Sequence, residues 1–542
     1  MAKVAAAPPA IAVSLSNPGM SALHRAGLAG LWMSLESIES DPEMATALRE
    51  TGAEWQRTET GVVIQPGPNW KKFLELLVGF SFRLTDDGRL WFLALGHPDE
   101  HQDRGVMLQD ALLQTFEQHG RTRGAEKGVT GAAVVSIEDE QLLLPYRRLS
   151  WYSHMKRADA LDLTGLTTVN GWLLPGATQR HIAFGETSLR ERPALALALW
   201  FAPVGSLYLK INRRTAGVRP QFCLAVPAFS SLSAYADARR YFLHRPVNEF
   251  VAAGTAEAAA RVLATLAAAN LLEGTGLARC DVVSFGVVPW NSQQKTRVDV
   301  FEVQADGRQL RALGAAIALH PAVRTIRDLP AANAAKGVGA TADANATRVE
   351  WRVSPVLDLV TRNVVAGKPW WRGFGDLSAD KDQRTQFEVY EFSLWRATRN
   401  TQGGIRGMVK QPGNFATDEE IFVSACHEAW HRTLGRLGQR ERECGEPFRD
   451  LVRRERERYR VGLTHCKNAA VLRATVTDFW SRAGGSLPPL QTGWREVLPL
   501  FSNSRWEEAR DLALLALASY EGAHGDEGDE EPADADPDGQ EN

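Results

Sequence analysis

The strand-like patterns of this 542-residue chain stop near residue 400, and only helical patterns continue beyond it. Before residue 330, short strand-like runs mix with amphipathic helical segments in no regular alternation. The strand-like runs include 132–137, 206–211, 221–229, 281–290 and 297–303. Since neither a GxGxxG nor a GxxxxGK(S/T) loop is present, a doubly wound nucleotide-binding fold is disfavoured. The sequence therefore predicts the class α+β, with an irregular mixed α/β N-terminal region followed by a C-terminal α-helical bundle.

Local patterns give specific predictions in the N-terminal region. Apolar residues at helical spacing predict a helix over 70–78. Asp87-Gly88 is typical of a hairpin turn, here between the runs 80–84 and 89–95. The N-terminus lacks the continuous apolar core of a signal peptide because two prolines interrupt it, so a first strand is expected there.

Beyond residue 400 the pattern predicts four amphipathic helices packed as a bundle. Thr417–Glu420 matches a capping box that opens the first helix, whose apolar stripe ends at Gly438. The second helix is expected to begin near Pro447, with this proline at its first position, and the third to cover about 468–482. The fourth is expected to open with another capping box, Ser504–Glu507.

Composition indicates the boundaries between these regions. Residues 331–347 are rich in Ala, Gly, Asn and Thr and lack periodicity, as linkers do. The predicted organisation is a mixed α+β region over 1–345, a connecting segment over 346–400, the helical bundle over 401–522 and an acidic disordered tail over 523–542.

The charge is divided unevenly along the chain. The formal net charge is −3, but residues 521–542 carry ten Asp and Glu and no Lys or Arg. The rest of the chain therefore has a net charge of about +7. A basic body with an acidic tail is found in nucleic-acid binders, and also in proteins that bind no nucleic acid. The five cysteines indicate no disulfide framework, and no apolar run is long enough to span a membrane. A cytoplasmic protein without a membrane partner is therefore expected.

Basic and amide-rich segments are the candidates for contact with nucleic acid, since cations bind phosphates and amides read base edges. The candidate DNA-binding residues are Lys210, Arg213, Arg214, Arg219, Asn291, Gln293, Gln294, Lys295, Arg406 and Lys410. The last two lie in a glycine-containing stretch that is expected to be flexible. The pair Trp370-Trp371 between basic residues is a candidate for stacking on single-stranded bases. The alternating charges of 453–458 indicate instead a salt-bridged helix face. Singly, each loop segment is better explained as solvated surface; together, they favour contact with a polyanion.

A second pattern indicates different chemistry. His427–His431 (HEAWH) matches HExxH on a predicted helix, the spacing with which two imidazoles bind zinc beside a glutamate base. The metzincin extension of this motif is missing, because leucines occupy the positions of its Gly and His. A CxxC pair, which would indicate a structural zinc site, is also missing from the sequence. No catalytic residue, metal or other cofactor is therefore predicted. A zinc metalloprotease using His427, Glu428 and His431 is the alternative from another functional class.

Seven sequence blocks resemble a known family. They are Leu23–Leu31 (LHRAGLAGL), Ser34–Glu39, Ala425–Trp430, Arg442–Arg460, Cys466–Ala470, Thr477–Trp480 and Arg510–Ala516. The family is the MYXAN-subtype large subunit of the type I CRISPR Cascade effector, named after myxobacteria. The blocks cover both ends of the chain and contain no catalytic signature.

The resemblance implies a non-enzymatic protein of antiviral defence. Such large subunits contact the protospacer-adjacent motif of target double-stranded DNA and hold the displaced strand of the R-loop, while the guide RNA reads the sequence. The implied partners are the CRISPR guide RNA, the backbone and guide-5′-end subunits of Cascade, and a helicase-nuclease recruited in trans. Residues 1–345 would then recognise DNA, and 401–522 would correspond to a small subunit, which translation restarting at Met408 would also produce. Regulation of fruiting-body development is a further alternative.

Overall fold

The chain forms two compact units, each with its own hydrophobic core. The first unit takes in Met1–Gly314 and Pro321–Val353, and the second Ala315–His320 and Ser354–Asn542. The structure, a computed structural model, describes residues 8–100, 102–118, 120, 122–124, 130–137, 140–169, 171–174, 189–212, 221–272, 277–288, 295–328, 347–379 and 402–521. The expected linker over 331–347 lies almost entirely outside these residues, as does the expected acidic tail.

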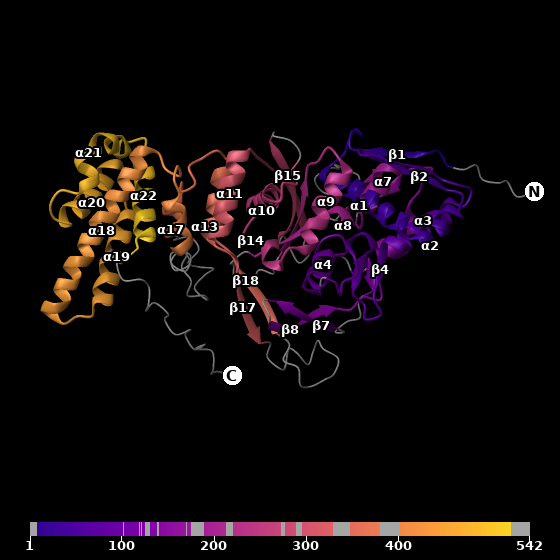
Figure 1. The fold of residues 1–542 in the computed structure, drawn as a ribbon, viewed down its shortest axis with the longest axis horizontal. Helices are drawn as coiled ribbons and strands as arrows, with labels where there is room; N and C mark the ends of the chain where they lie inside the picture. Colours follow the sequence, from indigo (N-terminus) through magenta and orange to yellow (C-terminus); the bar gives the residue numbers. More distant parts are fainter. Residues whose placement is uncertain are drawn as a thin grey trace, which may run out of the picture. The chain divides into compact units, whose positions relative to one another are not determined.

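A five-stranded sheet lies in the first unit (Figure 1). Its strands are β12 (Leu207–Ile211), β13 (Gln221–Pro227), β14 (Val251–Ala252), β15 (Ala278–Val288) and β16 (Lys295–Ala305). Their order is β14-β12-β13-β15-β16, with β14 parallel to β12 and the other neighbours antiparallel. The helix α10 (Thr255–Ala268) packs against β13 and β15. β13 is buried along nearly its whole length, which explains its continuous apolar run FCLAV.

Close approach between backbones holds one helix of the first unit against two others. The helices are α1 (Ala22–Glu39), α7 (Pro193–Trp200) and α8 (Ala202–Gly205). A Cβ atom added at Gly27 of α1 would lie 1.8 Å from the carbonyl oxygen of Ala198, and one at Gly205 would lie 1.8 Å from that of Ala26. Only glycine fits at these two positions. The glycines of the LHRAGLAGL block therefore have a packing role.

The local predictions are confirmed in the first unit. The N-terminal strand is β1 (Ile11–Ser14), which forms the edge of an antiparallel sheet of order β1-β3-β2. The helix expected at 70–78 is α3 (Trp70–Ser81). The expected hairpin consists of β4 (Phe82–Leu84) and β5 (Leu90–Phe92). Gly88 in its turn adopts a φ of +79°, a conformation that favours glycine.

The first unit contains further short elements. They are α2 (Pro42–Arg49), β2 (Glu54–Arg57), β3 (Gly61–Gln65), η1 (Leu93–Leu95), α4 (Gln102–Gln114), β6 (Arg123–Gly124), β7 (Thr130–Ile137), β8 (Glu140–Arg147), β9 (Trp151–Tyr152), α5 (Ser153–Lys156), η2 (Ala158–Ala160), β10 (Thr167–Thr168), β11 (Arg190–Glu191), α9 (Leu232–Tyr241), η4 (Phe242–His244), η5 (Val247–Phe250), β17 (Val323–Asp328) and β18 (Thr347–Arg352). α11 (Gly307–Leu319) begins in the first unit, and its C-terminal residues belong to the second.

The second unit is helical and is drawn from orange to yellow in Figure 1. Its helices are α13 (Pro355–Val365), α14 (Phe374–Ala379), α17 (Gln402–Lys410), α18 (Thr417–Cys444), α19 (Phe448–Thr464), α20 (Ala469–Arg482), α21 (Pro488–Val497) and α22 (Trp506–Ser519), with the 3-10 turn η6 (Leu498–Phe501). α22 lies at the centre, because every residue from Ala509 onward except Arg510 is buried. It contacts α14, α17, α18, α19 and α20.

The first helix of the bundle differs from its prediction at both ends. The N-cap of α18 is Ala416, whose amide donates to the Glu419 carboxylate at 3.0 Å, so the expected box from Thr417 to Glu420 is absent and an acidic contact of the same kind lies one residue earlier. α18 continues past Gly438 and ends before Gly445, which takes a left-handed φ of +69°. Good helix formers follow Gly438, so its own low helix propensity does not stop the helix.

The starts of two further helices also differ from prediction. Pro447 is the N-cap of α19 and not its first helical residue. Arg505 precedes α22 without a side-chain cap, so the expected capping box at Ser504 is absent. The third predicted helix is confirmed as α20, with Asn468 as a hydrogen-bonded N-cap. The sequence patterns did not predict α17 or α21.

Met408 lies inside α17 and is 2% exposed. It enters the same core as Val356, Trp371 and Phe374, which come from the chain before α17. A chain that began at Met408 would lack the first part of α17 and all of α13 and α14. The helical core is therefore shared with residues upstream of the region that the sequence predicted to form the bundle.

The fold class is α+β, as predicted, with mixed sheets in the N-terminal region and helices after residue 402. Within the described ranges, no helix combines the length and the apolar character that crossing a membrane requires.

Candidate nucleic-acid interface

Two of the predicted DNA-binding segments begin at the same end of the five-stranded sheet. β12 and β13 meet at the pair Ile211–Gln221, and β15 and β16 meet at the pair Val288–Lys295. The register between β13 and β15 places both pairs at one end of the sheet. The strand ends that border the two segments are therefore neighbours in space, although they are far apart in the sequence.

Most of the predicted residues of these segments lie outside the described part of the chain. They are Arg213, Arg214, Arg219, Asn291, Gln293 and Gln294. Lys295 is the first residue of β16. Lys210 is the penultimate residue of β12, where it pairs with Phe222 on one side and Val251 on the other. Its side chain is half-buried, so it belongs to the sheet and not to the loop that follows.

Arg406 and Lys410 lie on α17, so the expectation of a flexible stretch is wrong. α17 is ordered despite its glycines because its buried face packs into the core of the second unit. Arg406 Nη2 donates to the carbonyl oxygen of Tyr520 at 3.3 Å, and Lys410 forms an ion pair with Glu521. The Lys410 ammonium lowers the pKa of the Glu521 carboxyl below its usual range. Both cations therefore contact the residues that directly precede the acidic tail.

The arginines of α19 form ion pairs with nearby acids, as the alternating charge predicted. The pairs are Arg453–Asp450 at 2.9 Å, Arg454–Glu446 at 2.5 Å, Arg458–Glu455 at 3.6 Å and Arg460–Glu457 at 2.5 Å. Three of the four join residues one turn apart on the same helix. The pairs of the exposed Arg453, Arg454 and Arg458 contribute little to stability individually.

The tryptophans proposed to stack on bases are part of the core, so this prediction is wrong. Trp370 is 5% exposed and Trp371 is fully buried. The indole of Trp370 donates to the carbonyl oxygen of Asn414 at 3.2 Å, and its ring lies 5.7 Å from that of Phe415. The two rings anchor the segment between α13 and α14 on the helical core.

The first histidine of the HExxH segment contacts the central helix of the bundle. His427 Nε2 lies 3.1 Å from the carbonyl oxygen of Ala516 and 3.0 Å from the hydroxyl of Ser519. A hydrogen bond to a carbonyl requires a proton on Nε2, and that proton occupies the position a metal would take. Burial lowers the pKa of His427 to about 4, so the ring is neutral at physiological pH.

The other two residues of the motif also contact protein groups. Glu428 pairs with Arg432 at 2.7 Å, and His431 Nδ1 lies 3.0 Å from the Tyr520 hydroxyl. In the part of the chain that the structure describes, no three His, Cys, Asp or Glu side chains are grouped so that they could hold a metal ion. The motif thus serves the packing of α18 on the residues around α22.

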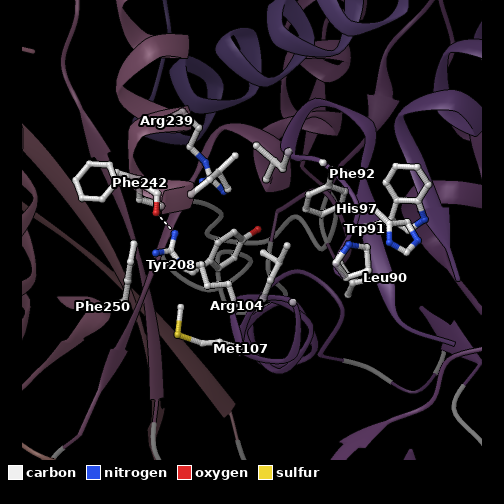
Figure 2. Close-up of a pocket in the computed structure, with 17 residues that line it drawn as sticks. Leu90, Trp91, Phe92, His97, Arg104, Met107, Tyr208, Arg239, Phe242 and Phe250 are labelled. Atoms are coloured by element: carbon white, nitrogen blue, oxygen red, sulfur yellow. Dashed lines mark hydrogen bonds between the residues drawn. The ribbon is translucent and has the colours of Figure 1, made fainter. Parts of the chain in front are cut away.

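The first unit contains a pocket of about 60 Å³ (Figure 2). Its lining comes from β5, α4, β12, α9 and the turns around them. The walls are largely apolar and aromatic, with Phe92, Tyr208 and Phe250 among them. Two arginines also line it, Arg104 from α4 and Arg239 from α9. Figure 2 shows the Arg239 side chain extending from α9 toward the space that Arg104 and Tyr208 border.

Arg239 is a polar residue that the sequence patterns did not single out. It is 6% exposed, and its Nε donates to the carbonyl oxygen of Val204 at 3.2 Å. Burial lowers the pKa of its guanidinium to about 10. A signal was present in the sequence, because Leu232, Tyr235, Ala236 and Arg239 follow helical spacing and share the buried face of α9.

Comparisons with known proteins match both units. The DevT N-terminal domain matches residues 12–200, and the DevT C-terminal domain matches residues 414–542. Together the two matches cover more than half of the chain. The chain is similar to DevT in both units. The matched ranges contain α1 of the first unit and α18 of the second.

A curated relative agrees with this family. The chain is 28% identical to a protein of Myxococcus xanthus (strain DK1622) named "CRISPR-associated protein Cas8a1/Csx13". The alignment covers 98% of this chain and 92% of the relative. The resemblance to the myxobacterial type of CRISPR large subunit is thereby confirmed.

Proposed function

We propose that the protein is the large subunit of a guide-RNA CRISPR effector and has no catalytic activity of its own. The observation that carries the proposal is the similarity, over 98% of the chain, to a protein named as CRISPR-associated. The DevT matches fall in both units, so the proposal concerns the whole chain. The proposed partners are the guide RNA, the backbone and guide-5′-end subunits, and a helicase-nuclease recruited in trans.

Contact with target DNA is proposed at the sheet end where β12, β13, β15 and β16 meet. The register brings the borders of the two basic and amide-containing segments to that end. Two segments at one sheet end are able to contact the same short stretch of duplex. Arginines there would bind phosphates, and the amides of Asn291, Gln293 and Gln294 would contact base edges of the protospacer-adjacent motif.

The class is tested by affinity purification of the tagged protein from its host, followed by sequencing of bound RNA. We expect repeat-derived guide RNA together with the backbone subunits. Purification of the protein without RNA and without other subunits would contradict the proposal. A tagged protein carrying Gly27→Val, which is expected to unfold the first unit, is the control for RNA that binds non-specifically.

The interaction with DNA is tested by neutralising charges in two places. Replacing Arg213, Arg214 and Arg219 with Gln should weaken DNA binding across sequences and reduce the salt dependence by about one slope unit for each phosphate that is no longer neutralised. The matched control replaces Arg453, Arg454 and Arg458, whose charges are paired, and should change binding less. Equal effects of the two triple variants would contradict the assignment.

Recognition of the flanking motif is tested separately. Replacing Gln293 or Gln294 with Ala should change which motif is preferred in a library of flanking sequences, because base contacts specify whereas phosphate contacts only position. An unchanged preference would remove these residues from the recognition surface.

The alternatives gain no support from the described geometry. The metalloprotease rests on the five-residue motif, and its His427 and Glu428 are engaged in contacts within the protein. Regulation of fruiting-body development stays a prediction from the resemblance.

A further inference from the structure

The pocket in the first unit contains a buried positive charge, Arg239, that no described acid balances. Among the described residues, no carboxylate oxygen lies within 4 Å of the Arg239 guanidinium, and the only hydrogen bond of this side chain is the one from Nε to Val204. Its two Nη nitrogens therefore have donor capacity left. No Asp or Glu is found among the described residues that line the pocket.

Another buried arginine of the same unit shows the usual arrangement. Arg261 is 4% exposed, and its Nε donates at 2.7 Å to Glu257, which is itself fully buried. A buried charge is costly unless it is paired and hydrogen-bonded, and Arg261 meets this condition. Arg239 has no such acidic partner among the described residues. Its burial therefore requires either a ligand that pairs with the charge or a fold that remains stable with the charge unpaired.

We propose that the pocket binds an oxyanion of the size of a phosphate group, with Arg239 as its principal ligand. The Nη nitrogens are free to donate to two oxygens of one oxyanion, the geometry in which arginine binds phosphate and carboxylate most strongly. The apolar walls exclude water from this interaction and thereby strengthen it. This proposal is independent of the proposed function, because it rests on the pocket alone.

The volume of the pocket and a second cation in its wall, Arg104, are compatible with a bound oxyanion of this size. A volume of about 60 Å³ is several times the roughly 10–15 Å³ that a single water molecule needs, so the pocket has room for a small group of a few heavy atoms. Arg104 supplies another positive charge at the wall. Its guanidinium donates to the carbonyl oxygen of Phe242 and lies 4.9 Å from the centre of the Phe250 ring, which fixes its orientation.

The oxyanion has two possible sources, a free phosphate compound and a phosphate of a nucleic-acid backbone. Two probes distinguish them: inorganic phosphate, and a short single-stranded oligodeoxynucleotide in phosphate-free buffer. Hydrogen exchange is measured on peptides from 102–114 and 232–241, the helices α4 and α9, at constant ionic strength. Protection by inorganic phosphate assigns a free oxyanion, and protection by the oligonucleotide alone assigns a backbone phosphate. Protection by neither probe would overturn the proposal.

Substitutions then test the role of Arg239. We expect Arg239→Met to weaken the effective probe by about ten- to a hundredfold, because a charge-assisted hydrogen bond is removed. Without the probe, this variant should melt no lower than the parent, because an unpaired buried charge has been replaced by an apolar side chain of similar size. Arg240→Met is the matched control, since Arg240 is the next residue of α9 but pairs with Glu36 and Asp237 at the surface.

Each outcome for these variants decides the question. Unchanged probe affinity in Arg239→Met, or an equal loss in Arg240→Met, would overturn the proposal. If Arg239→Met does not fold, Arg239→Lys retains the charge but not the two-pronged geometry, and it should bind the probe more weakly than the parent. Parent-like affinity of Arg239→Lys in that case would also overturn the proposal.

Discussion

In the first unit α1 meets α7 and α8 through glycines, whereas in the second unit aromatic rings fill the space between helices. At Gly27 the neighbouring carbonyl leaves no room for one carbon atom. In the bundle, the Tyr459 and Phe479 rings stack at 4.0 Å, and Phe422 lies 5.5 Å from Trp480. The two units are therefore expected to be sensitive to different kinds of substitution. Atoms added to α1 are expected to damage the first unit, and atoms removed from these rings are expected to damage the second.

The largest expected effect is that of adding atoms to α1. Gly27→Val places a side chain where a Cβ would already lie 1.8 Å from the Ala198 carbonyl oxygen. We expect the first unit to lose more than about 4 kcal/mol of its free energy of unfolding, the range of severe overpacking. Hydrogen exchange should show reduced protection in α1 and α7. Gly79→Ala on α3 is the control, since open space surrounds it and its stability should rise by up to about 1 kcal/mol. A parent-like Gly27→Val variant would refute the proposed close packing.

Removal of an aromatic ring from the bundle should come next. Phe422 is fully buried between Trp480 and Phe501, so Phe422→Ala leaves a cavity and should cost about 3–5 kcal/mol. Urea unfolding followed by exchange in α18 and α20 measures this loss. Val471→Ala, at a side chain that is 44% exposed, should cost less than about 0.5 kcal/mol. Similar losses for both variants would mean that the bundle does not depend on ring packing.

Acid should weaken the second unit through its buried histidines. Burial lowers the pKa of His320 from 6.5 to about 4, so between these values the unfolded chain binds more protons than the folded one. Stability therefore falls as the pH falls through this window, by about 2 kcal/mol between pH 7 and pH 5 for His320. Half-buried His427 adds a smaller loss in the same direction. Urea midpoints at both pH values measure the slope, and His320→Gln should flatten it. A slope unchanged by that substitution would assign the acid sensitivity to other groups.

The smallest expected effect is at the exposed ion pairs of α19. Arg453 is 72% exposed at its side chain and pairs with Asp450 at 2.9 Å, so Arg453→Gln should change stability by about 0.5 kcal/mol or less. The measurement is the urea midpoint at low and at high salt, where the difference from the parent should shrink further. A larger loss would show that the pair belongs to a network.

The sequence predicted those features that depend on local periodicity. The helix α3, the hairpin around Gly88, the first strand and the change to helices beyond residue 400 all follow from the spacing of apolar residues and from turn chemistry. Helix ends were less predictable. Whether a glycine ends a helix depends on the residues after it, so Gly438 was mistaken for the end that Gly445 forms.

The candidate sites depended on contacts between distant parts of the chain. Basic residues beside Trp370 and Trp371 suggested an exposed stacking surface, but the rings complete a core whose other members lie far along the sequence. The shared sheet end became visible only through the register between β13 and β15. Arg239 had a helical pattern that indicated burial, but only the folded chain shows that none of the described acids lies near its guanidinium.

The central position of α22 has a consequence for how the protein is made. Synthesis is vectorial, and the helices that surround α22 all leave the ribosome before it. Until the chain has been made as far as Ser519, these helices have no partner for the surfaces that α22 will cover. Their apolar faces are then exposed to other nascent chains, a state that favours aggregation. Among the described helices of the second unit, α22 is synthesised after all the others and closes the core, so the need for chaperones should be greatest before it emerges.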